Sequence, residues 1–247
     1  MIVSRPLAVI GTPFSTFTRT ITLALHYKGL PFNQVHVLPH SDTAYEHHPF
    51  GFLPTLVIHE IEGKVVDLKL RESMAIARYL DRLAPQPSLC VSVSDRSVLV
   101  VEEQMWEFVS FVAAHGDQSS FVQFRPYLIP QCLGFPAVEK GVVKPRVALT
   151  DEGKLSGAEV RQEISGGIEK LLKFLTVIES TMSPGGYVFG EELSWADVFL
   201  YPLLADLNAT PERDLLSVRL RMWMDLMGNL DAVKATTAGT LSVGARP

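Results

Sequence analysis

The chain has 247 residues, 47% of them hydrophobic and 20% charged, a balance that excludes a disordered protein and predicts one large or two ordinary globular domains. Its formal net charge of -5, with Lys and Arg scattered, argues against a nucleic-acid surface. No stretch reaches the roughly 18 apolar residues of a membrane-spanning helix, and the opening MIVSRPLAVIGTPF is typical of a first strand rather than a signal peptide. We therefore expect a cytoplasmic protein that binds neither nucleic acid nor membrane.

Strand and helix patterns alternate in the first third of the chain. Period-two or continuous apolar runs predict strands, and apolar residues at i, i+3, i+4 and i+7 predict helices. The expected strands lie at residues 5–11, 35–38, 55–59 and 64–67. The expected helices lie at about 15–29 and 70–83. The order is therefore βαβ, an irregular loop, a β-hairpin and a final helix.

A break at APQPSLCVSVSD separates this region from a helical remainder. We expect one domain over 1–84, a linker over 85–94 and a second domain over 95–247. The helical patterns of the second domain lie at about 95–123, 156–182, 195–208 and 213–228. Between the first two, about 30 residues carry four prolines, which predicts a long loop that is a candidate lid. The tail TTAGTLSVGARP is expected to fray.

The two cysteines, Cys90 and Cys132, lack CxxC or metal-type spacing. We expect free thiols and no metal site.

Hydroxyl side chains gather in PFSTFTRT, directly after the first predicted strand. Ser15, Thr16, Thr18 and Thr20 are typical of a helix N-cap, because Ser and Thr satisfy the orphan amides of a first turn. The same geometry can also hold an anion or a thiolate. The residues alone leave both interpretations open.

Two further segments carry candidate chemistry. Pro54 directly precedes a strand, either as an ordinary trans proline or as a cis proline that turns the Leu53 backbone toward a ligand. Arg71-Glu72-Ser73 opens the next helix, where a hydroxyl and free amides suit a carboxylate and Glu72 suits an ammonium. An ordinary cap with an acidic first turn is the simpler interpretation of the second segment.

Taken in order, PFSTFTRTITLALHYKGLPF, GFLPTLVI and LRESMAIARYL resemble the N-terminal domain of the glutathione S-transferases. FGEELSWADVFLYPLLADL resembles the helical-domain motif of that family, and its Ser194 and Asp197 have capping-box spacing. The hydroxyl-rich stretch is most similar to that of serine-type, phi-like members of the family. The whole chain looks like a fungal cytosolic member, and such a member can act in a natural-product pathway. The resemblance implies an α/β thioredoxin-like N-terminal domain that binds glutathione, an all-α C-terminal domain with a hydrophobic substrate pocket, and a homodimer.

The resemblance also implies roles by position. Ser15 falls on the catalytic serine, whose hydroxyl donates to the glutathione sulfur, with Thr16 and Thr18 as alternatives. Leu53 falls on the residue whose backbone pairs with the cysteinyl unit, and Pro54 is then cis. Glu72 and Ser73 fall on the pair that holds the γ-glutamyl end. The candidates for the second substrate pocket are His115, Phe121 and Tyr127.

Two positions depart from the family's pattern. Phe52 stands where a Gln or Lys commonly assists glutathione binding. No residue of this sequence clearly matches the basic residues that bind the glycine carboxylate of glutathione in the family. We retain His40 as the candidate. The ordinary interpretation of His40, His47 and His48 is that they are surface histidines.

The leading hypothesis is a glutathione transferase in which a thiolate formed at Ser15 attacks a hydrophobic electrophile, a secondary metabolite being one candidate. Two alternatives remain. A glutathione-dependent trans-cis isomerase would add the thiol reversibly to a conjugated alkene. A non-catalytic, transferase-like binding or regulatory module would fit Phe52, whereas the Ser15 hydroxyl and the Glu72-Ser73 pair favour catalysis.

Overall fold

The computed structural model describes residues 6–61, 63–91, 99–113 and 133–246. The chain divides into two compact units, one of residues 1–90 and 227–247 and the other of residues 91–226. Within the described residues, no helix is both long enough and apolar enough to cross a membrane.

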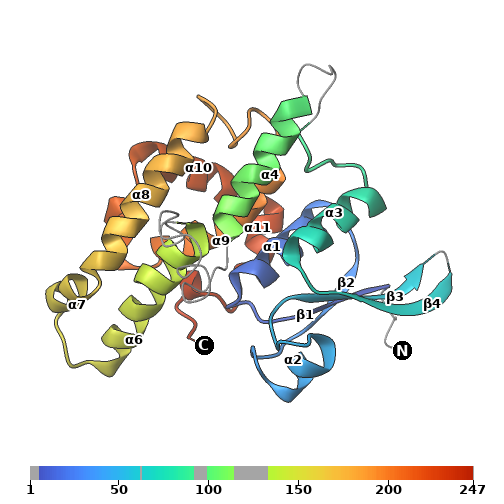
Figure 1. Ribbon diagram of the computed structural model, residues 1–247, viewed down its shortest axis with the longest axis horizontal. Coiled ribbons are helices and arrows are strands. Elements are labelled where there is room, and N and C mark those ends of the chain that lie inside the picture. Colours follow the sequence, from blue (N-terminus) through green and yellow to red (C-terminus); the bar gives the residue numbers. More distant parts are fainter. Residues whose placement is uncertain (1–5, 62, 92–98, 114–132, 247) are drawn as a thin grey trace, which may run out of the picture. The chain divides into compact units, whose positions relative to one another are not determined.

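A four-stranded mixed sheet lies at the centre of the first unit (Figure 1). Its strands are β1 (Leu7–Ile10), β2 (Phe32–Val35), β3 (Thr55–Ile61) and β4 (Lys64–Leu70). In the order β2-β1-β3-β4, β1 is parallel to β2 and antiparallel to β3, and β4 is antiparallel to β3. The helices between and after the strands are α1 (Thr16–Tyr27), α2 (Asp42–His47) and α3 (Ser73–Leu83). This is the expected thioredoxin-like α/β arrangement.

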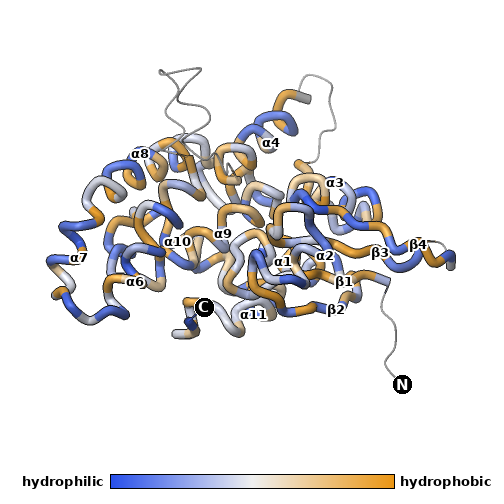
Figure 2. The backbone as a smooth tube through the Cα atoms, turned by 60° about the horizontal axis from the view of Figure 1, so that its bottom comes forward, coloured by the Kyte–Doolittle hydropathy of each residue, from blue (hydrophilic) through white to orange (hydrophobic). Residues whose placement is uncertain are grey.

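Apolar periodicity explains why these elements pack. All four residues of β1 are buried, as expected of an interior strand, and Figure 2 shows a similar apolar stretch along β3. The helices α1 and α3 contact each other. Ile21 and Leu25 on α1, and Ile76 and Leu80 on α3, are each 0% exposed, so each helix buries an i, i+4 pair.

The register of the sheet brings two sequence motifs together. Ile10, the last residue of β1, pairs with Thr55, the first residue of β3. Because these strands are antiparallel, the chain that leaves β1 at Gly11 lies opposite Pro54, which leads into β3. The hydroxyl-rich stretch and the Leu53-Pro54 segment therefore lie at the same end of the sheet.

The last part of the chain belongs to the first unit rather than to a helical domain ending at residue 247. Helix α11 (Asp231–Ala235) contacts α1, and its Ala232 and Val233 are 8% and 2% exposed. After α11 the tail folds into consecutive turns with a 3-10 helix, η5 (Leu241–Val243), instead of fraying. Buried contacts with α1, which lies more than 200 residues earlier in the sequence, hold this segment.

The described part of the second unit is helical, which agrees with the predicted all-α domain. Its elements are α4 (Leu99–Ala113), the π-helix η3 (Pro136–Val143), α6 (Lys144–Glu152), α7 (Gly157–Glu163), α8 (Ser165–Thr181), α9 (Trp195–Asn208), the 3-10 helix η4 (Pro211–Leu215) and α10 (Val218–Gly228), which ends in the first unit. Helix α9 is buried along nearly its whole length and contacts α4, η3 and η4. The predicted capping box of Ser194 and Asp197 is present at its start.

Several sequence-based boundaries are corrected. Residues 136–152, expected to be loop, are helical: Pro136 and Pro145 each lie in the first turn of a helix, where no amide hydrogen is needed. The helix predicted at 156–182 is divided at Ile164. In the first unit, β2 lies at Phe32–Val35 rather than 35–38, and α2 was not predicted.

Candidate active site

Ser15 caps the first turn of α1. Its backbone is extended, with φ -77° and ψ 115°, and its Oγ accepts a hydrogen bond from the backbone N–H of Thr18 at 3.2 Å. Its side chain is half-buried, whereas Thr16 and Thr18 are only 3% and 0% exposed. Since the oxygen of Ser15 already accepts from the helix, its O–H proton remains available as a donor at the positive end of α1.

The turn before α1 is held by its own hydrogen bonds and by close packing. Ser15 N donates to the carbonyl oxygen of Thr12 at 3.0 Å, and Phe14 N lies 3.5 Å from the Thr12 hydroxyl. A Cβ atom built on Gly11 would lie 2.3 Å from the Oγ1 of Thr18. Gly11 is therefore the residue that lets Thr18 pack against the end of β1, and this contact fixes the first turn that Ser15 caps.

The Leu53-Pro54 peptide bond is cis, as predicted from the resemblance. Pro54 is buried and Leu53 is half-buried. Through the pairing of Ile10 with Thr55, this segment lies opposite the chain that leads to Ser15.

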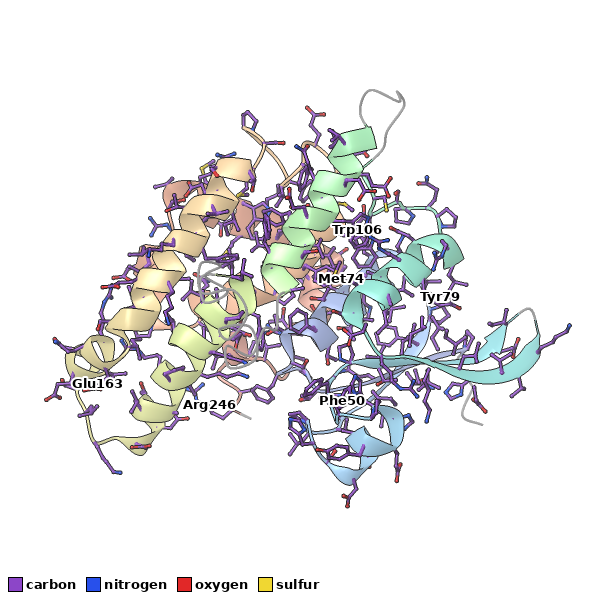
Figure 3. The ribbon with its side chains drawn as sticks, in the orientation of Figure 1. Phe50, Met74, Tyr79, Trp106, Glu163 and Arg246 are labelled. Carbon is purple, nitrogen blue, oxygen red and sulfur yellow. The ribbon has the colours of Figure 1, made fainter. Side chains whose placement is uncertain are left out.

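Glu72 and Ser73 stand at the start of α3. Glu72 is the N-cap residue, its side chain is exposed and makes no capping hydrogen bond, and Ser73 is 8% exposed. The preceding residue, Arg71, donates from Nε to the carbonyl oxygen of His47 at 2.8 Å and so ties the start of α3 to α2. Figure 3 labels Met74, which follows on the same helix. The carboxylate of Glu72 is thus available to a cationic group in solution.

His40 lies in an aromatic cluster that we define by His40, Tyr45, His48, Phe50 and Phe52, of which Tyr45, Phe50 and Phe52 are exposed. His40 has a positive φ of 60°, and its Nδ1 is 3.3 Å from the Tyr45 hydroxyl. Phe52, which is 51% exposed, makes an edge contact with the His40 ring at 5.6 Å between centroids. Phe50, labelled in Figure 3, is 65% exposed.

His48 is not a surface histidine, which corrects the sequence interpretation. It is 3% exposed, and its Nδ1 accepts a hydrogen bond from Phe50 N at 3.1 Å. Burial lowers the pKa of His48 below its ordinary value, and the positive charge of Arg71 adds to this effect while Glu72 opposes it.

The three candidates for the second substrate pocket, His115, Phe121 and Tyr127, lie outside the described residues. Of the three aromatic residues that precede them on α4, Trp106 and Phe108 are 6% and 3% exposed and belong to the core, whereas Phe111 is half-buried. Among the described residues, no group of three or more His, Cys, Asp or Glu could hold a metal ion.

Residues 14–83 match the family model of the glutathione S-transferase N-terminal domain, and residues 160–226 match that of the C-terminal domain. The chain belongs to the glutathione S-transferase family. It is 27% identical over 217 residues to glutathione S-transferase F7 of Arabidopsis thaliana, covering 85% of this chain and 88% of the relative.

Solved structures of glutathione transferases share the fold. Glutathione transferase F7 from Populus trichocarpa aligns with a TM-score of 0.64 and 23% identity over 93% of this transferase and 97% of that chain. A glutathione transferase homologue from Sulfitobacter with bound glutathione aligns with a TM-score of 0.62 and 18% identity over 94% and 97% of the two chains.

The structure reveals one site feature that the sequence analysis missed. Gly11 stands at the end of an apolar run and before a hydroxyl-rich stretch, so a close approach of the backbone could have been suspected there. Its neighbour Thr18 is seven residues later, and only the folded turn shows that the two interlock.

Proposed function

We propose that this glutathione S-transferase activates the thiol of glutathione through the hydroxyl of Ser15 and transfers the resulting thiolate to a hydrophobic electrophile. The observation that carries the proposal is the hydrogen bonding of Ser15: its oxygen accepts from Thr18 N, which leaves its proton free to donate to a ligand. Ser15 is also half-buried, which weakens competition from water.

The hydroxyl of Ser15 and the N-terminus of α1 supply enough free energy to ionise the glutathione thiol without a basic side chain that takes up its proton. A free thiol has a pKa of about 8.5, and lowering it by two units requires roughly 2.7 kcal/mol of preference for the thiolate. A hydrogen bond to a charged partner supplies about 1.5–3 kcal/mol, and a helix N-terminus adds about 0.3–1 kcal/mol. Ser15 at the start of α1 combines both contributions.

The remaining contacts to glutathione are assigned on the same basis. The exposed carboxylate of Glu72 suits the α-amino group of the γ-glutamyl residue, and Ser73 at the start of α3 suits its carboxylate. The backbone of Leu53, before the cis Pro54, would pair with the cysteinyl unit. His40 is the candidate for the glycine carboxylate.

Catalysis is tested by conjugation of glutathione to a chlorodinitrobenzene with wild type and Ser15→Ala. Removing one donor from a developing or resident anion costs about 10²–10³-fold in rate, so we expect kcat/KM to fall by at least about 10²-fold. Ser156→Ala is the matched control, since Ser156 caps α7 in the same way and lies in the other unit. Equal rates for wild type and Ser15→Ala would contradict the serine mechanism.

Binding of the γ-glutamyl end is tested by calorimetry on Glu72→Gln. Loss of one charge-assisted contact of about 1.5–3 kcal/mol predicts a Kd for glutathione raised about 10-fold or more. Glu60→Gln, at another exposed glutamate of the first unit, is the control and should bind like wild type. Equal affinity of the two variants would remove Glu72 from the site.

The second substrate and the assembly are proposed more broadly. We assign the electrophile to the helical domain, with His115, Phe121 and Tyr127 as candidate contacts, and expect a cytoplasmic homodimer. A conjugated alkene of known geometry as substrate separates transfer from isomerisation: glutathione is consumed in the first case and recovered together with the other geometric isomer in the second. Saturable glutathione binding with turnover of neither the chlorodinitrobenzene nor the conjugated alkene would instead favour a binding module.

A further inference from the structure

The C-terminal segment 236–246, which we name the C-terminal turn, packs on the chain just before Ser15. A Cβ atom built on Gly239 would lie 3.3 Å from Cγ and 3.4 Å from Cβ of Pro13. Gly239 has a φ of +73°, a conformation that glycine adopts without a steric penalty. The backbone of Gly239 therefore lies so close to the ring of Pro13 that a side chain at this position would press on the ring.

The C-terminal turn is a built structure rather than a loose end. Thr240 is 2% exposed, and its hydroxyl donates to the carbonyl oxygen of Thr237 at 2.7 Å. Ala245 N closes the turn by donating to the carbonyl oxygen of Thr240 at 3.2 Å. Helix α11, directly before it, is anchored on α1 in the same unit, and Figure 3 labels Arg246 near its end.

Pro13 transmits this contact to Ser15 over a very short path. The two residues are separated by Phe14 alone, and the hydrogen bond from Ser15 N to Thr12 O spans the turn that contains Pro13. The other side of the first turn of α1 is fixed by the packing of Thr18 against Gly11. We expect a displacement of Pro13 to shift Ser15, because only Phe14 separates the two residues and the hydrogen bond from Ser15 N to Thr12 O encloses both.

We propose that Gly239 is a positioning residue for Ser15: because it has no side chain to press on Pro13, Pro13 keeps the place that sets where the Ser15 hydroxyl lies relative to the sulfur of bound glutathione. The inference rests on the proposed function. Hydrogen bonds weaken steeply with distance and misalignment, and small misplacements of a catalytic group can cost large factors in rate. The C-terminal turn thus controls how well the thiolate is stabilised through the position of Pro13.

Two glycines of the C-terminal turn provide a matched test. Gly239 and Gly244 have φ values of +73° and +76°, both are exposed, and nothing lies within 4 Å of a Cβ on Gly244. Asn tolerates this backbone conformation, so Gly239→Asn and Gly244→Asn carry the same conformational cost. The side chain added at Gly239 presses on Pro13, whereas the one added at Gly244 meets solvent.

The readout is the ionisation of bound glutathione, followed by thiolate absorbance against pH at saturating glutathione. We expect Gly239→Asn to raise the midpoint by about half a pH unit or more, which is a roughly threefold change in the thiolate equilibrium. Gly244→Asn should have the wild-type midpoint. At a pH below the wild-type midpoint, where bound glutathione remains a thiol in all three proteins, both variants should bind it within about twofold of wild type. Equal midpoints for the two variants would overturn the inference.

A second variant separates positioning from local damage. In Gly239→Asn with Pro13→Ala, the smaller side chain makes room, so the midpoint should return toward the wild-type value. Failure to recover would contradict transmission through Pro13. If wild-type enzyme does not lower the pKa of bound glutathione, the proposed function fails and this inference falls with it. If wild type lowers the pKa and Ser15→Ala does not, equal midpoints for the two Asn variants overturn the positioning role alone.

Discussion

Replacement of Asp197 tests what holds the second unit together. Asp197 is 0% exposed. Its Oδ1 accepts from Val188 N at 2.8 Å and from Trp223 Nε1 at 2.9 Å, and its Oδ2 accepts from Ser194 N at 3.0 Å and Ser194 Oγ at 2.7 Å. The carboxylate thus joins the start of α9 to α10 and to the segment before α9.

The expected cost differs between two substitutions. In Asp197→Asn the remaining oxygen can keep the bonds from Val188 and Trp223, but the amide group faces Ser194 N–H, and one buried donor left without an acceptor costs about 1–3 kcal/mol. Burial raises the pKa of Asp197, so the neutral amide regains some desolvation energy and the net cost should be in the lower part of that range. In Asp197→Ala three N–H groups lose their acceptor, so the cost should be at least twice that of Asn.

Urea unfolding followed by tryptophan fluorescence measures both costs. The three tryptophans of the chain, Trp106, Trp195 and Trp223, all lie in the second unit, so the signal reports on that unit. Asp225→Asn, at an exposed aspartate of α10, is the control and should change the free energy of unfolding by less than about 0.5 kcal/mol. An unchanged stability of Asp197→Asn, or equal costs for Asn and Ala, would refute the assigned hydrogen bonding.

Three further predictions concern the first unit, each measured by circular dichroism during unfolding. Gly11→Ala should cost about 1–3 kcal/mol through overpacking, and adding Thr18→Ala should recover most of it; additive losses would contradict the interlock. The native state binds a proton on His48 less tightly than the unfolded chain does, because burial lowers the pKa of His48. The free energy of unfolding should therefore be constant above the ordinary pKa of 6.5 and fall as the pH drops from 6.5 through the lowered pKa of the folded state. If His48→Gln has the same pH profile of stability as wild type, this role of His48 is contradicted. Lys28→Met should cost about 3 kcal/mol or more, because the Lys28 side chain is 0% exposed and pairs with Asp81 at 2.6 Å; a loss below about 1 kcal/mol would contradict that role.

Elements with strong local signals could be predicted from the sequence. The apolar run of β1, the stripe that places Ile76 and Leu80 on one face of α3, and the spacing of Ser194 and Asp197 at the start of α9 all specify structure within a few residues. The resemblance then indicated Ser15 and the cis Pro54, because their motifs occur in order along the chain.

Features that depend on distant contacts could not be predicted. The burial of His48 and the packing of Gly239 on Pro13 are set by the tertiary fold, and no local pattern distinguishes these residues from a surface histidine or a loop glycine. The loop predicted around Pro136 and Pro145 was wrong for another reason. A proline is compatible with both a loop and the first turn of a helix, and only the burial of the valines of η3 distinguishes the two structures.

The most direct test of the central claim is the pH titration of thiolate absorbance for glutathione bound to wild type, Ser15→Ala and Ser15→Thr, with binding verified by calorimetry at each pH. We expect the bound thiol in wild type to ionise about two units below its free value near 8.5. Ser15→Thr keeps the hydroxyl and should stay near wild type, whereas Ser15→Ala should still bind glutathione with a thiol pKa close to the free value. A thiol pKa in Ser15→Ala as low as in wild type would contradict activation by Ser15.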